Sequence, residues 1–78
     1  MEPLDAAVAV LRDADEPLHW TVIQDRALRG GLIDPFEVPD VRSVLLAALR
    51  DGLRAGVLVR AGTGVYALGE PAPGPERP

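Results

Sequence analysis

Apolar side chains recur at helical spacing near the start of the chain, over residues 4–14. They follow the i, i+4, i+7 pattern of one helical face, and the residues are Leu4, Ala7, Val8 and Leu11. Pro17 cannot continue this helix, because its ring removes a hydrogen-bond donor and clashes with the preceding turn. The pattern predicts an amphipathic helix that ends before Pro17.

A second, shorter helix is predicted from Thr21 to about Arg29. Thr21-Val22-Ile23-Gln24 matches the capping box, Ser/Thr-x-x-Glu/Gln, which marks a helix start. Gly30-Gly31 is expected to end the helix, because glycine accepts the left-handed backbone of a helix end. The inward-facing positions would be Ile23, Ala27 and Leu28. Leu18 to Trp20 is expected to form a short edge strand.

The longest predicted helix follows a connection in which Asp34-Pro35 forms a turn. Asp40 can cap this helix, which runs to about Ala55 with Gly56 past its end. At about 100° per residue its apolar side comprises Val41, Val44, Leu45, Ala48, Leu49 and Gly52. The opposite side comprises Ser43, Ala47, Arg50 and Arg54, with Arg42 and Leu46 flanking it.

Two β-rich runs, Val57–Arg60 and Val65–Leu68, surround a glycine-containing turn at Ala61–Gly64 and predict an antiparallel hairpin. A lone hairpin is marginal in water, so it must pack on the helices. We expect that contact to come mainly from Val57, Val59, Tyr66 and Leu68. The order helix, short strand, helix, helix, hairpin predicts a mainly α, α+β fold. It is that of a winged helix-turn-helix, with three helices, a C-terminal hairpin wing and a short edge strand.

Composition adds a domain boundary and excludes several classes of protein. Residues 1–69 are expected to form one domain, and the proline-rich residues 70–78 a disordered tail. With no cysteine and one histidine, we expect no disulfide, no metal site and no cofactor. No apolar run approaches membrane-spanning length, and the first residues are acidic, unlike a signal peptide. A soluble, cytoplasmic protein is the expectation.

Charge gives conflicting indications about nucleic acid. The formal net charge is −4, whereas domains that bind nucleic acid electrostatically are usually basic. All eight positive charges are arginine, the side chain that binds phosphates and guanine edges in a bidentate way. A GC-rich coding sequence also explains the absence of lysine. Whether the arginines indicate nucleic-acid binding therefore depends on their positions in the fold.

The candidate DNA-binding residues lie on the third helix and the wing. Winged helices usually place one helix in a major groove, and here its exposed face carries Arg42, Ser43, Arg50 and Arg54. Arg60 and Thr63 of the wing could contact backbone phosphate. The alternatives are an ordinary solvated helix face and a polar turn.

Catalysis is not expected. His19 is interpreted as a packing or capping residue, since Ser43 lies on another helix and no pocket is implied. Trp20 and Tyr66 are interpreted as core or partly buried residues. The carboxylates at Asp13, Asp15 and Glu16 are interpreted as a solvated helix end.

Taken in order, several motifs resemble the HARE-type helix-turn-helix domain. They are Leu11, Pro17-Leu18-His19-Trp20, Ile23, Arg26-Ala27-Leu28, Gly31-Leu32-Ile33, Pro39, Arg50-Asp51 and the segment Arg60 to Leu68. The resemblance covers residues 4–69. Two positions depart from it: Val38-Pro39 replaces a Thr-Pro pair, and Gly52 replaces a large apolar residue.

That family includes the RNA polymerase delta subunit and chromatin-associated and restriction-associated proteins. The resemblance therefore implies a non-catalytic module that associates with DNA in transcription or its regulation. The alternative is a protein-docking winged helix that binds RNA polymerase or a chromatin partner. The acidic balance favours docking, because counterion release from phosphates needs positive contacts, whereas the arginine face favours DNA.

Overall fold

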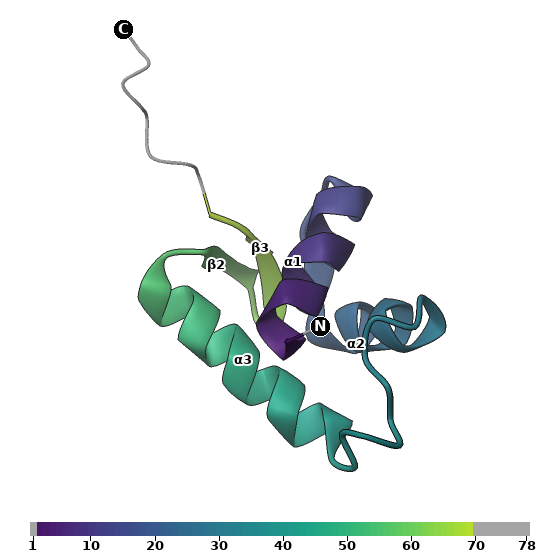
Figure 1. The fold of residues 1–78 in the computed structure, drawn as a ribbon. Helices are drawn as coiled ribbons and strands as arrows, with labels where there is room; N and C mark the ends of the chain where they lie inside the picture. Colours follow the sequence, from purple (N-terminus) through teal and green to yellow (C-terminus); the bar gives the residue numbers. More distant parts are fainter. Residues whose placement is uncertain (1, 70–78) are drawn as a thin grey trace, which may run out of the picture.

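A computed structural model describes residues 2–69 and contains three helices and three short strands over that range (Figure 1). The elements are α1 (Pro3–Ala14), β1 (Leu18–His19), α2 (Trp20–Arg29), α3 (Val41–Ala55), β2 (Leu58–Gly62) and β3 (Val65–Leu68). The expected tail, residues 70–78, lies outside the described residues. The predicted element order is confirmed.

The strands form one antiparallel sheet in the order β1-β3-β2, which confirms both the hairpin and the edge strand. Tyr66 of β3 is the central position, opposite Leu18 of β1 on one side and Arg60 of β2 on the other. The register is irregular between Arg60 and Gly62. Strand β2 extends to Gly62, so the turn that connects it to β3 is shorter than predicted. This mixed α+β layout is that of a winged helix.

The predicted packing face of β2 is wrong by one residue. Val57 and Val59 are 41% and 45% exposed, whereas Leu58 is 1% exposed. The cause lies at the end of α3, where Gly56 has φ +80° and the Val57 N–H donates to the Gly52 carbonyl at 2.9 Å. Val57 thus belongs to the helix cap, and Leu58 is the first strand residue that faces the core, because strand side chains alternate.

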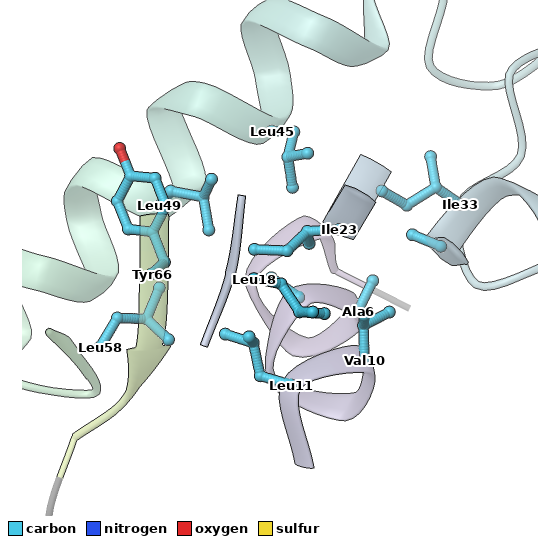
Figure 2. Packing of buried hydrophobic residues seen from close by; sticks show 12 residues of the cluster. Ala6, Val10, Leu11, Leu18, Ile23, Ile33, Leu45, Leu49, Leu58 and Tyr66 are labelled. Carbon is cyan, nitrogen blue, oxygen red and sulfur yellow. The ribbon is translucent and has the colours of Figure 1, made fainter. Parts of the chain in front are cut away.

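The core lies where α1, α2, α3 and the sheet meet (Figure 2). Its buried members are Ala6, Ala7, Val10, Leu11, Leu18, Ile23, Ala27, Ile33, Leu45, Leu49, Leu58 and Tyr66. Two predicted faces are shifted slightly, because the neighbours that a helix packs against decide which of its sides is buried. In α1 the buried stripe is centred on Ala7 and Val10, with Leu4 half-buried, and in α3 Val44 is 36% exposed.

The capping box predicted at Thr21 does not form. The cap of α2 is His19, whose Nδ1 accepts a hydrogen bond from the Thr21 N–H at 3.2 Å. Strand β1 leads directly into the helix, because His19 pairs with Val65 and the Trp20 N–H donates to the Gly64 carbonyl at 2.9 Å. The helix therefore begins at Trp20, and Thr21 already lies inside it. A capping role for His19 was one of its two expected roles.

The start of α3 is as predicted and yields a stability prediction. Asp40 Oδ1 accepts a hydrogen bond from the Ser43 N–H at 3.3 Å. Asp40→Ala is expected to lower the free energy of unfolding by about 1 kcal/mol, because the amide loses its capping partner. Asp40→Asn keeps an oxygen acceptor and is expected to remain close to the parent protein. Urea denaturation of both variants checks this, and equal losses would contradict it.

Candidate nucleic-acid interface

The exposed face of α3 is the face that the residue spacing predicts. Ser43, Ala47, Arg50 and Arg54 are all exposed, whereas Leu45 and Leu49 on the opposite side are fully buried. The buried leucines pack the helix against α1 and the sheet, so the arginines on the opposite side point into solvent. The helix thus presents a polar face that no described part of the protein covers.

The arginines differ in whether they are paired with a carboxylate. The Arg54 guanidinium lies 3.8 Å from the Asp51 carboxylate, and both side chains are mostly exposed. Exposed pairs of this kind contribute little and are screened by salt, so Arg54 can exchange this partner for another anion. Within residues 2–69, neither Arg42 nor Arg50 nor Arg60 forms a salt bridge. Their guanidinium groups are therefore not paired with a carboxylate in this part of the chain.

Arg42 has an aromatic neighbour that the sequence patterns do not indicate. Its guanidinium carbon lies 5.5 Å from the centroid of the Trp20 ring. The Trp20 ring is half-buried and lies 5.8 Å from the His19 ring. Trp20, expected at the end of a strand, instead opens α2 and lies beside the first turn of α3. Arg42 is therefore held beside α2, at the edge of the α3 face.

The wing contributes its two candidate residues in different ways. Residues opposite each other in an antiparallel pair share one face of the sheet, and Arg60 lies opposite the buried Tyr66. Arg60 therefore lies on the face of the hairpin that packs against the helices, although it is itself exposed. Thr63 is exposed in the turn between β2 and β3. Arg60 is thus on the helix-facing side of the wing, and Thr63 is in its turn.

Charge is distributed unevenly along the chain, a signal that the overall net charge hides. Residues 41–69, which form α3 and the hairpin, contain four arginines and one carboxylate, Asp51. Residues 2–40 contain three arginines and nine carboxylates. The first set has a formal charge of +3 and the second of −6. The sequence segment that forms α3 and the hairpin is therefore basic in an acidic protein, although Asp40 caps α3 and Glu2 borders a hollow with Ala47 and Asp51.

The other candidate groups do not converge with this surface or with each other. His19 caps α2 and Ser43 lies in the first turn of α3, with no hydrogen bond between them. Asp15 and Glu16 border a surface hollow with Leu11, Ala67 and Leu68. Within residues 2–69, no three His, Asp or Glu side chains are grouped so that they could hold a metal ion.

In comparisons with known proteins, the chain matches no protein-family model, no curated protein and no solved structure. The HARE-type resemblance consequently rests on the sequence motifs alone. A search of residues 2–69 for membrane-spanning helices finds none of sufficient length and hydrophobicity.

Proposed function

We propose that this winged helix is a non-catalytic module that associates with duplex DNA in transcription or its regulation. Its third helix would meet a groove through Arg42, Ser43, Arg50 and Arg54. Arg60 and Thr63 of the wing would contact the backbone. The HARE-type motifs point to the same role, and the expected location remains the cytoplasm.

The observation that carries this proposal is the charge separation between the two parts of the chain. Affinity for duplex DNA comes largely from phosphates neutralised by arginine or lysine, and it requires a local basic surface more than a basic protein. Four of the seven arginines between residues 2 and 69 lie on α3 and the hairpin, together with one carboxylate. The acidic remainder would limit affinity and prevent binding in other orientations.

A salt-dependent binding titration tests the proposal. A fluorescein-labelled duplex of about 20 base pairs is titrated with the protein at about 20 mM salt, and then at increasing salt. We expect weak binding with a steep salt dependence, because each neutralised phosphate contributes a slope of about −0.9. Electrostatic attraction is strongest at low salt, so absence of binding at about 20 mM would refute the DNA proposal.

Docking to a protein is the second candidate, and the loop before α3 favours it. Phe36 is 94% exposed, and its N–H donates to Asp34 Oδ1 at 2.9 Å, so the backbone of this turn is held. An exposed aromatic residue beside Asp34 and Glu37 suits a protein partner with a basic rim, such as RNA polymerase or a chromatin component.

The docking surface proposed at Phe36 lies outside the proposed DNA surface, and one substitution tests whether this loop takes part in DNA binding. Phe36→Ser is expected to leave the affinity for duplex DNA unchanged, because the α3 face and the wing do not include this loop. The titration above measures it, and melting by circular dichroism checks the fold. A clear loss of DNA affinity in a folded variant would move the interface toward the loop.

A further inference from the structure

We infer that Trp20 is a positioning residue that holds Arg42 at a corner shared by α3 and the wing turn, where both can bind phosphate backbone. This inference rests on the proposed function. It adds a residue that does not contact DNA itself but positions one that does, and it assigns Arg42 to the phosphate backbone instead of the groove. We call the group formed by His19, Trp20, Arg42 and Gly64 the aromatic corner.

The Arg42 side of the corner has the geometry of a cation–π contact. The distance of 5.5 Å from the guanidinium carbon to the ring centroid is within the limit of about 6 Å for such contacts. Trp20 is half-buried and packs on the core, so its ring is a fixed surface. Arg42 is exposed and forms no salt bridge with a carboxylate between residues 2 and 69. A guanidinium ordered before binding loses less conformational entropy when it meets a phosphate.

On the wing side of the corner, Gly64 lies close to both His19 and Trp20. The Trp20 N–H donates to the Gly64 carbonyl at 2.9 Å. A Cβ atom at Gly64 would lie 2.8 Å from His19 Nε2 and 3.4 Å from Trp20 Cδ1, and φ at this residue is +71°. The positive φ favours glycine at this position. The turn is therefore packed directly against both rings, and Thr63 precedes it in the chain.

Trp20 thus contacts both the first turn of α3 and the wing turn, which are more than twenty residues apart in sequence. A guanidinium and a hydroxyl are typical donors to phosphate oxygens, and such contacts fix the register of a protein on DNA without reading its sequence. The corner would accordingly bind the sugar-phosphate backbone, while Arg50 and Arg54 face the groove. Its loss should weaken binding equally for duplexes of different sequence.

The test compares Trp20→Phe, Trp20→Leu, Arg42→Gln and the double variant Trp20→Leu/Arg42→Gln, titrated with two 20-base-pair duplexes of unrelated sequence. We expect Arg42→Gln to weaken binding ~10-fold at about 50 mM salt and to reduce the salt slope by about 0.9. Trp20→Leu should weaken binding ~3-fold. Trp20→Phe should keep most of the wild-type affinity, because phenylalanine retains a ring face. The double variant should bind no worse than Arg42→Gln alone.

A purely structural role for Trp20 would give a different result, since Trp20→Leu would then weaken binding equally with or without Arg42. That outcome overturns the inference, as does wild-type affinity in Arg42→Gln. Trp20 is the only tryptophan, so its emission reports the corner even if Trp20→Leu fails to fold. Arg42→Gln should change that emission in the free protein, and an unchanged spectrum would also overturn the inference.

Failure of the proposed function gives its own signature. If the wild-type protein binds neither duplex at about 20 mM salt, where attraction is strongest, both the DNA proposal and this inference are wrong. If it binds, and Arg50→Gln/Arg54→Gln weakens binding while Arg42→Gln does not, only this inference is wrong.

Discussion

Replacing Gly52 with valine is expected to lower the free energy of unfolding by about 2 kcal/mol, as for other overpacked cores. Gly52 is buried in α3, where this helix meets α1 and β2. A Cβ atom there would lie 2.7 Å from Leu58 Cδ1 and 2.9 Å from Leu4 Cδ1. Leu58 is fully buried, and its Cγ would also lie 2.9 Å from the added Cβ, so more than the end of the side chain would have to shift. Valine adds two further methyl groups to this contact.

Helix propensity opposes this loss but is smaller. Valine is more favourable than glycine within a helix by about 0.4 kcal/mol, against about 1–3 kcal/mol for overpacking. In a domain of this size each kcal/mol shifts the melting temperature by about 4–8 °C, so a decrease of about 10 °C is expected. Melting followed by circular dichroism measures it.

Ala47→Val is the matched control, because Ala47 lies exposed on the same helix. Ala47→Val should lower the free energy of unfolding by only about 0.6 kcal/mol, from helix propensity alone. Gly52→Val and Ala47→Val melting at the same temperature would show that Gly52 has room for a side chain. The result also bears on the HARE-type resemblance, which implies a large apolar residue at this position. Here Leu58 and Leu4 occupy that space instead.

The helices could be predicted from sequence because their ends carry local signals. Asp40 at the start of α3 and Gly56 after its end act through hydrogen bonds with neighbouring residues, so short sequence windows contain the necessary information. The face of β2 could not be predicted in the same way. It depends on where the cap of α3 ends, and a shift of one residue turns every strand side chain to the other face.

The candidate site divides in a similar way. The exposed position of Arg50 and Arg54 follows from the period of a single helix, and the structure agrees with it. The contact between Arg42 and Trp20 joins two helices, and it depends on the pairing of β1 with β3, which no periodicity indicates. The charge separation could have been found by comparing the charge of residues 2–40 with that of residues 41–69 instead of using the total.

Removing the charges of Arg50 and Arg54 together is expected to reduce affinity for duplex DNA by up to ~10²-fold at about 50 mM salt. The same change, Arg50→Gln/Arg54→Gln, should flatten the dependence of log affinity on log salt by up to about two units. Arg50 should contribute the larger part, because it forms no salt bridge within residues 2–69, whereas Arg54 must first exchange Asp51. Both side chains are exposed, so the melting temperature should stay nearly constant.

Arg12→Gln/Arg26→Gln is the matched control for net charge. These two exposed arginines lie in α1 and α2, within the acidic part of the chain, and neither forms a salt bridge with the residues from 2 to 69. The control removes the same two charges, so a comparable loss of affinity would mean that DNA responds only to the total charge. A loss confined to the Arg50 and Arg54 variant would instead locate the contact on α3. If affinity is unchanged in both variants, the α3 face is excluded as the DNA surface. The loss of a phosphate contact there would lower both the affinity and its salt dependence.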